Sequence, residues 1–210
     1  MMNFKKESLV KKAAFTLFSF LTWIHISHAQ TTETNCETAK IFMNDMGKNV
    51  ISLLTNDSIS DKERADQFRT ILETQFNLKA IGKFVLGRYW KQASDEEKQT
   101  FLNLFKETTV ATYAARFKDY TSEKFEIRGC HVEPDGGVIV SSQITRPSGQ
   151  VIPINWKIFE KKGEMRVYDV ILEGISMGIT QRSEFASVIQ NGGGRLEALN
   201  KALEKKIPQS

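Results

Sequence analysis

The spacing of apolar residues changes twice along this chain, and this change restricts the fold more than any other feature of the sequence. Apolar residues recur at three- and four-residue intervals over about 35–120, alternate with polar residues over about 123–173, and return to the helical interval over about 179–205. The first interval is typical of helices and alternation is typical of strands. Because the strands are grouped and not interleaved with helices, the pattern favours an α+β fold.

Capping patterns locate the expected helix starts in the first half. Ser or Thr followed three residues later by Glu forms a capping box, in which each side chain accepts a hydrogen bond from the other residue's backbone N–H. Three such patterns stand at the starts of apolar helical stretches, at Thr34, Ser60 and Ser94. We expect helices to start there, the last of them running to about Tyr120. Asn77 is placed to cap a further short helix over 78–86.

Short turns divide the alternating part into four expected strands. Residues 134–137, 146–149 and 161–163 are rich in Gly, Pro, Asp and Lys. Turns this short favour an antiparallel meander. Within the third strand, the even-numbered residues from Ile152 to Ile158 are apolar, so one face of the sheet must be covered by helices. An incompletely filled space beneath such a cover would be an apolar pocket.

The first 29 residues have the pattern of a secretory signal peptide. Four Lys precede a mostly apolar run over 13–26, which is too short for a stable membrane anchor. Ser27 and Ala29 supply the small residues of a cleavage site before Gln30. We therefore predict that residues 1–29 are a signal peptide, that the mature chain starts at Gln30, and that residues 30–210 form one domain.

Removal of this segment changes the charge of the protein. The full chain has 29 basic and 25 acidic residues and a net charge of +4. The signal segment contains four Lys and one Glu, so the mature chain keeps 25 basic and 24 acidic residues, a net charge of +1. This near balance gives no basis for a nucleic-acid partner.

Little in the mature sequence indicates catalysis. His131 is the one histidine after residue 29, which excludes a multi-histidine metal site. The acidic cluster Asp95-Glu96-Glu97 lies in the first turn of an expected helix, where negative charge stabilises the helix dipole. We expect no catalytic residue, no metal and no cofactor.

Two cysteines remain in the mature chain, Cys36 and Cys130. In an oxidising compartment two cysteines can form a disulfide. Pairing also requires the two residues to lie close together in the fold. Both alternatives, a disulfide and two free thiols, stay open at this point.

Two stretches carry a resemblance to a known family. They are FVLGRYWKQAS at 84–94 and VYDVILEGIS at 167–176, the second followed by QRSEF at 181–185. Their order and separation resemble the MlaC family, also called the toluene-tolerance family. The resemblance extends over essentially all of 30–205. The chain departs from the family in its two cysteines and in the triple glycine at 192–194.

The resemblance implies a fold and a function. The fold would be a curved antiparallel four-stranded meander of NTF2-like type, covered by N-terminal helices and two C-terminal helices, with an apolar cavity between. The function would be that of a periplasmic phospholipid carrier. It would shuttle lipid between an outer-membrane lipoprotein–porin complex and an inner-membrane MCE-domain ABC transporter complex, and so maintain outer-membrane lipid asymmetry.

Other functions stay open beside this one. A hopanoid or another apolar ligand is the nearest alternative cargo. An exported NTF2-like enzyme would use His131 or Asp169 as its base. An interaction protein without a ligand would have all its aromatic residues in a solid core.

The predicted lipid-binding residues are large and apolar, and most belong to the two family stretches or to strand faces. Plain core packing is the alternative for each of them. They are Phe84, Leu86, Trp90, Phe101, Phe105, Val140, Ile154, Trp156, Val170, Leu172, Ile175 and Met177. Trp156 and Tyr168 suit the mouth of a pocket, because each has an apolar body and a polar tip. For Asp169 we expect a salt bridge with Arg88 or Arg182.

Overall fold

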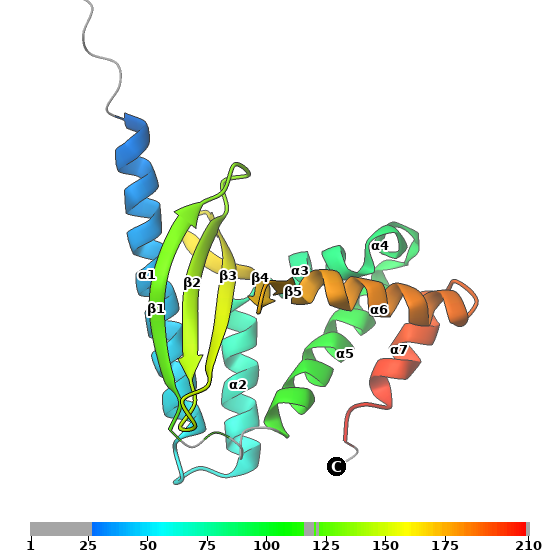
Figure 1. Ribbon diagram of the computed structural model, residues 1–210. Helices are drawn as coiled ribbons and strands as arrows, with labels where there is room; N and C mark the ends of the chain where they lie inside the picture. The colour runs from blue at the N-terminus through cyan, green and yellow to red at the C-terminus, as the bar shows by residue number, and fades with distance from the viewer. Residues whose placement is uncertain (1–26, 116–119, 121, 209–210) are drawn as a thin grey trace, which may run out of the picture.

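The computed structural model describes residues 27–115, 120 and 122–208, with side chains from residue 35 onward (Figure 1). Five helices precede an antiparallel sheet and two follow it. The helices are α1 (Ser27–Leu54), α2 (Asp61–Gln75), α3 (Leu78–Leu86), α4 (Arg88–Gln92), α5 (Asp95–Ala114), α6 (Met177–Asn191) and α7 (Leu196–Glu204). The strands are β1 (Lys124–Val132), β2 (Val138–Thr145), β3 (Val151–Lys161), β4 (Glu164–Leu172) and β5 (Ile175–Ser176). The predicted α+β class is confirmed.

Two predicted capping boxes start helices as expected. The Ser60 hydroxyl accepts from the Glu63 N–H at 3.2 Å, and the Ser94 hydroxyl accepts from the Glu97 N–H at 3.1 Å. In both boxes the glutamate carboxylate accepts from the serine N–H at 2.8 Å. The Asn77 side chain likewise accepts from Ala80 N at 3.0 Å and caps α3. The acidic cluster at 95–97 lies in the first turn of α5, as predicted.

The predicted capping box at Thr34 is wrong, because α1 already includes Ser27. The fourth expected helix ends earlier than predicted, at Ala114. A five-residue helix, α4, and a two-residue strand, β5, were not predicted, because neither is long enough to show a period. The predicted signal peptide lies almost entirely in 1–26, outside the described residues, and stays a prediction.

The sheet is an open meander in the order β1-β2-β3-β4-β5, with every neighbouring pair antiparallel. The predicted meander is therefore confirmed, with five strands in place of four. The three predicted turns each contain a glycine whose φ is near +80°, a conformation in which a Cβ is strained. The NTF2-like classification stays a prediction.

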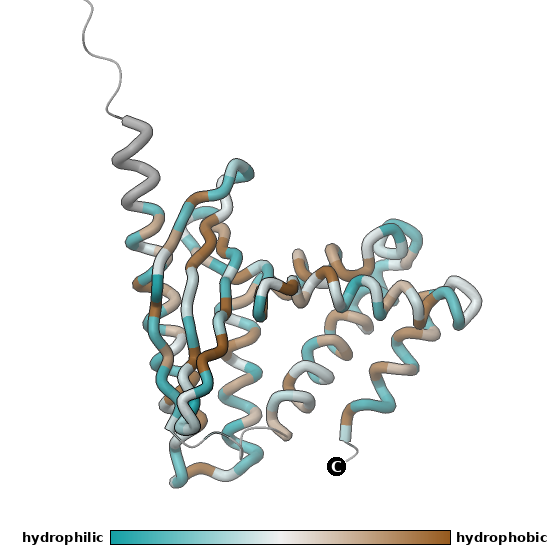
Figure 2. The backbone as a smooth tube through the Cα atoms, viewed as in Figure 1, coloured by the Kyte–Doolittle hydropathy of each residue, from teal (hydrophilic) through white to brown (hydrophobic). Residues whose placement is uncertain are grey.

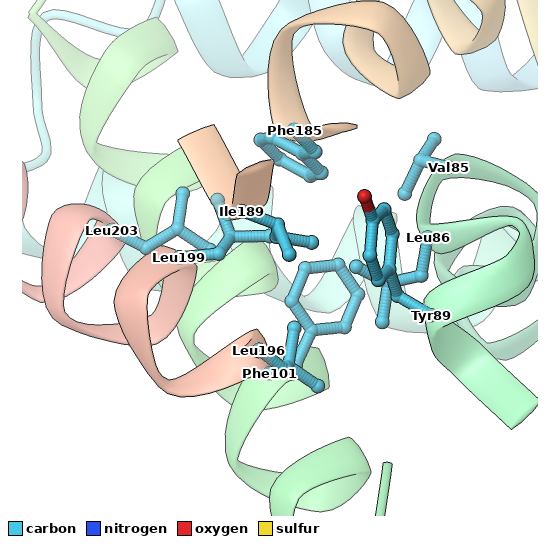
Figure 3. Packing of buried hydrophobic residues seen from close by; sticks show 9 residues of the cluster. All are labelled: Val85, Leu86, Tyr89, Phe101, Phe185, Ile189, Leu196, Leu199 and Leu203. Carbon is cyan, nitrogen blue, oxygen red and sulfur yellow. The ribbon is translucent and has the colours of Figure 1, made fainter. Parts of the chain in front are cut away.

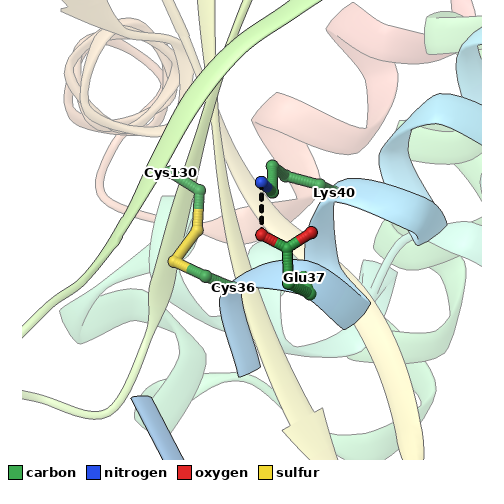
Figure 4. Close-up of a disulfide and its surroundings, with 4 residues drawn as sticks. All are labelled: Cys36, Glu37, Lys40 and Cys130. Carbon is green, nitrogen blue, oxygen red and sulfur yellow. Dashed lines mark ion pairs between the residues drawn. A yellow bond between two sulfur atoms is a disulfide. The ribbon is translucent and has the colours of Figure 1, made fainter. Parts of the chain in front are cut away.

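Helix α1 covers the apolar face of the sheet at β1 and β2 (Figure 1). A disulfide joins Cys36 on this helix to Cys130 on β1, with 5.8 Å between the Cα atoms (Figure 4). The pairing that the sequence left open is thus present. A buried cluster lies beside it between helix and sheet, formed by Ala39, Met43, Met46, Val138, Val140, Ile158 and Val167.

A second core lies entirely between helices, beside the sheet (Figure 3). The ring of Phe101 is fully buried and contacts Phe185 edge-on, with 5.8 Å between the ring centroids. Helices α6 and α7 turn their apolar residues towards this core. The prediction that the two C-terminal helices cover the sheet is therefore wrong: α7 packs on α5 and α6, and α6 extends away from β4 and β5 (Figure 1).

The capping box of α5 yields a first prediction. Replacing Ser94 by Ala removes the side-chain acceptor for the Glu97 N–H, so Ser94→Ala should lower the free energy of unfolding by about 1 kcal/mol. Urea unfolding followed by circular dichroism measures this. Ser94→Asp, which keeps an acceptor at the cap, should stay close to the parent protein. An equal loss in both variants would contradict the assigned role of the cap.

Within the described part of the chain, no helix is both long enough and apolar enough to cross a membrane.

Candidate functional site

One row of side chains crosses the apolar face of the sheet and emerges from the core. Ser142, Ile154, Leu172 and Ile175 are register partners on β2, β3, β4 and β5, so they point to the same face. Ser142 is 2% exposed and Ile154 is 8% exposed, whereas Leu172 is partly buried and Ile175 is 60% exposed. We call the three apolar members, Ile154, Leu172 and Ile175, the apolar row. Because α1 packs on β1 and β2, the β4–β5 end of the row lacks this cover.

Further large apolar residues are exposed at the start of α6 and on α3, which packs against α6. Phe84 on α3 is 43% exposed and Ile179 on α6 is 63% exposed. The Phe84 ring lies over Gly178, close enough that a Cβ added there would be 3.2 Å from the ring. Figure 2 shows the chain strongly hydrophobic where β5 enters α6. Phe84, Ile175, Met177 and Ile179 are therefore called the apolar corner.

The apolar corner is where the two family stretches meet in space. Phe84 begins the first stretch, and the Arg182 guanidinium of the second lies 5.3 Å from the Phe84 ring centroid. The same guanidinium lies against Gly87, where an added Cβ would come within 2.9 Å of Arg182 Nη2. Gly87 also has φ +53° and ψ −120°, a conformation that only glycine adopts without strain. The two stretches thus build one local structure.

Asp169 holds the start of α6 against the sheet. Its Oδ2 accepts from the Ser176 hydroxyl at 2.5 Å, and its Oδ1 accepts from Gly178 N at 2.9 Å and Val170 N at 2.9 Å. The Ser176 hydroxyl in turn accepts from Ile179 N at 3.0 Å. The predicted salt bridge with Arg88 or Arg182 is therefore wrong. The carboxylate lies at a helix N-terminus, where backbone N–H groups satisfy it instead.

This arrangement gives a second prediction. Asp169→Ala leaves the Gly178 N–H without its acceptor at a partly buried position, so the free energy of unfolding should fall by about 2 kcal/mol. Thermal or urea unfolding measures the loss. Amide hydrogen exchange of Gly178 should become faster, while the exchange of the α7 core amides should change no more than the global loss requires. Unchanged exchange at Gly178 would contradict the proposed link between β4 and α6.

Arg88, in the first family stretch, contacts its neighbour in the sequence. Arg88 Nη2 donates to the Tyr89 hydroxyl at 3.0 Å, and the guanidinium lies 5.0 Å from that ring. This hydrogen bond from a cation lowers the pKa of Tyr89 from its usual value. Arg88 is thus part of the surface of the helical core and does not reach Asp169.

The twelve predicted lipid-binding residues fall into three groups. Leu86, Trp90, Phe101 and Phe105 belong to the helical core or pack on it. Val140, Ile154, Trp156, Val170 and Leu172 lie on the apolar face of the sheet. Phe84, Ile175 and Met177 lie at the apolar corner. The structure brings the second and third groups together through the pairing of Leu172 with Ile175, and it places the first group in a separate core. Lipid contact by any of them stays a prediction.

The two residues expected at a pocket mouth lie on different faces of the sheet. Trp156 Nε1 donates to the Ser142 hydroxyl at 2.8 Å, so its polar tip is satisfied inside the protein. The Ser142 hydroxyl in turn donates to the Ile154 carbonyl oxygen at 3.1 Å. Tyr168 instead contacts Phe159 edge-on, with 4.9 Å between the ring centroids, and lines a separate cleft of about 410 Å³.

The remaining sequence candidates for chemistry lie apart from these sites. His131 is exposed on β1, with its Nε2 3.5 Å from a Glu133 carboxylate oxygen. Among the residues that the structure describes, no three His, Cys, Asp or Glu side chains are grouped closely enough to hold a metal ion.

Comparison with known proteins decides the family. The model of the MlaC protein family matches residues 44–205. This range includes both family stretches and most of the described fold. The chain belongs to the MlaC family.

Individual relatives agree with this assignment. The MlaC-family chain is 28% identical over 170 residues to the intermembrane phospholipid transport system binding protein MlaC of Haemophilus influenzae, covering 76% of this chain and 79% of the relative. It is 25% identical over 133 residues to the toluene tolerance protein ttg2D of Pseudomonas putida, covering 63% and 62% of the two chains.

A solved structure shares the fold. The phospholipid-binding protein from Ralstonia solanacearum, determined in complex with a phospholipid, superposes with a TM-score of 0.69 at 19% identity. The match covers 79% of this MlaC-family chain and 94% of the other.

Sequence reasoning missed two features of the site. Ile179 was assigned to a helix but not to the exposed corner, because Phe84 on the other side of the corner comes from the distant helix α3. The 410 Å³ cleft was missed because its lining residues come from α2, α3, α5 and the β3–β4 hairpin. No segment contributes more than two cations, so no local charge pattern could have revealed it.

Proposed function

We propose that this chain is a periplasmic phospholipid carrier that shields acyl chains at the exposed end of the apolar row. The observation that supports this most is the rise in exposure from Ile154 at 8% to Ile175 at 60% within one continuous apolar row. Covering such an apolar surface lowers the free energy of a folded protein in water. The names of the MlaC relative and of the phospholipid-bound structural neighbour support a phospholipid as the cover.

Carrying a lipid in this way needs no catalytic step. An acyl chain of about sixteen methylenes gains roughly 13 kcal/mol on leaving water, at about 0.8 kcal/mol for each methylene. Free lipid is therefore strongly disfavoured between two membranes, and a carrier must cover the tails while the polar headgroup stays in water. Leu172, Ile175 and Met177 supply a surface for this, and Phe84 extends it onto α3.

Native mass spectrometry of the exported protein tests the proposal. We expect a bound species with about two acyl chains, and loss of this mass after delipidation. The delipidated protein should regain the mass from vesicles of phosphatidylethanolamine. If the bound species is a hopanoid, the protein is a carrier of that apolar ligand and not of phospholipid. A protein that is isolated free of ligand and takes up no lipid from vesicles would contradict the carrier function.

We infer export by the signal peptide at 1–29, and exchange of lipid with an inner-membrane MCE-domain ABC transporter complex and an outer-membrane lipoprotein–porin complex. This route would maintain outer-membrane lipid asymmetry. The word intermembrane in the relative's name supports this route. An N-terminal sequence of the exported protein that begins before Ala13 would contradict the cleavage, and loss of outer-membrane asymmetry on deletion would support the route.

A further inference from the structure

A cleft of about 410 Å³ lies at the opposite end of β4 from Leu172. It opens where the junction of α2 and α3 crosses the edge of β4, next to the β3–β4 hairpin. Asn77 N donates to the Val167 carbonyl oxygen at 3.0 Å and ties the junction to the strand. The cleft is lined by Glu73, Phe76, Asn77, Leu78, Lys79, Leu102, Asn103, Lys106, Lys161, Glu164, Arg166 and Tyr168.

Positive charge exceeds negative charge around this cleft. Its lining has four cations and two carboxylates. Lys106 Nζ lies 2.6 Å from Glu73 Oε1, and Arg166 Nη2 lies 2.9 Å from Glu164 Oε2, so each carboxylate already has a cation. Among the described residues, neither Lys79 nor Lys161 forms an ion pair within 4.0 Å. Both lysines are thus outside any ion pair, although the charge of Lys79, after that of Lys98, helps to lower the pKa of Asp95.

Backbone donors add to this charge at the start of α3. The Asn77 side chain accepts from Ala80 N at 3.0 Å, and the Asn77 carbonyl oxygen accepts from Ile81 N at 2.9 Å. Neither acceptor takes the N–H group of Leu78 or Lys79, which precede Ala80 in the first turn of α3. Both residues line the cleft at the positive end of the helix dipole.

Tyr168 supplies a further donor and part of an apolar floor. Its hydroxyl oxygen accepts from Asn77 Nδ2 at 2.7 Å, which leaves the hydroxyl hydrogen available for a ligand. Lys161 Nζ lies 5.4 Å from the centroid of the same ring. Phe76, Leu78 and Leu102 complete the floor. The cleft therefore combines anion donors with an apolar surface next to them.

We propose that this cleft binds a phosphate ester. The phosphate would be held by the ammonium groups of Lys79 and Lys161, the two backbone N–H groups and the Tyr168 hydroxyl, while its organic part would lie on the apolar floor. A phosphate tetrahedron presents several acceptor oxygens to such a set of donors. The ester is either free in solution or the headgroup of a lipid. The inference goes beyond lipid carriage and does not depend on it.

An amide-resolved NMR titration tests the site with two probes, sodium phosphate and glycerol 3-phosphate, on delipidated protein at low salt. We expect saturable chemical-shift changes of the Leu78 and Lys79 amides with both probes. The affinity obtained from them should be higher for glycerol 3-phosphate than for phosphate. Lys79→Gln/Lys161→Gln should bind about a hundredfold more weakly, at about tenfold for each charged hydrogen bond removed. The control Lys48→Gln/Lys205→Gln removes the same charge from exposed lysines outside the lining and should bind as the parent does.

Two results would overturn the site. One is the absence of saturable shifts at Leu78 and Lys79 with both probes. The other is an equal loss of affinity in the control variant, which would show that the overall charge of the protein, and not the cleft, accounts for binding.

Loading from phosphatidylglycerol vesicles separates the two sources of the phosphate. If the lipid headgroup occupies the cleft, loaded protein no longer responds to glycerol 3-phosphate and the Lys79→Gln/Lys161→Gln variant loads less lipid. If the cleft takes a free ester, loaded protein binds the probe as before and the variant loads normally. Both results support the site. A parent protein that binds the probe but takes up no lipid would contradict the carrier function and leave this inference intact.

Discussion

Leu172→Asp is expected to abolish bound phospholipid while the protein still unfolds in one cooperative transition. Leu172 is partly buried at the point where the apolar row leaves the cover of α1. A carboxylate against an acyl chain costs several kcal/mol, which the lipid cannot recover elsewhere. Without lipid, water can reach the same carboxylate, so the fold tolerates it. Native mass spectrometry reports the lipid and thermal unfolding reports the fold.

Neighbouring positions supply the controls for this result. Ile171→Asp places the same charge one residue earlier, on the opposite face of the sheet, and should leave bound lipid in place. Ile154→Asp places it at an 8% exposed position in the same row and should unfold the domain. A folded Leu172→Asp protein that keeps its lipid would contradict the assignment of the apolar row. An unfolded one would favour a solid core at this position.

Removal of the disulfide should produce the largest loss of stability. The bond joins residues 94 positions apart, and the chain-entropy model assigns about 4–5 kcal/mol to the closure of such a loop. Cys36→Ser/Cys130→Ser should therefore unfold about 10–15 °C below the parent protein, at about 2–4 °C for each kcal/mol in a domain of this size. Differential scanning calorimetry of both proteins measures the difference.

The reduced parent protein and the single variants separate the bond from the side chains. If the bond itself stabilises, Cys36→Ser, Cys130→Ser and the reduced parent should all unfold near the temperature of the double variant. Thiol labelling of exported, denatured and non-reduced protein should find no free cysteine. Two labelled thiols would contradict the disulfide and would leave the carrier function untouched, because neither sulfur lies on the exposed part of the apolar row.

Local signals predicted most of the secondary structure. The capping boxes at Ser60 and Ser94 set helix starts through hydrogen bonds between residues three apart, which any window of the sequence contains. The hairpin turns are equally local. By contrast, α4 and β5 are too short to show a period, and Gly87 stops α3 through a backbone conformation that the residue type permits but does not demand.

The candidate site was predicted only in part. Alternation placed Ile154 and Leu172 on one face of the sheet, and the structure agrees. The predicted lipid-binding set also included Phe101, as another large apolar residue, but Phe101 lies in the helical core with α6 and α7. The apolar spacing of a helix shows that one of its faces is covered, but not which element covers it. The role of Asp169 likewise depends on β5 and α6 folding back to within 2.9 Å of its carboxylate.

The sequence by itself determined the α+β class, the meander, most helix starts and the family of this protein, because periods, caps, turns and family motifs are properties of contiguous residues. Only the tertiary structure decided that Cys36 meets Cys130, that the C-terminal helices lie beside the sheet, and that cations from distant segments surround one cleft. The spacing of apolar residues in the sequence is the same whether their side chains pack against protein or bind a lipid. The difference between Phe101, which is fully buried, and Ile175, which is 60% exposed, arises from which elements pack together after the chain has folded.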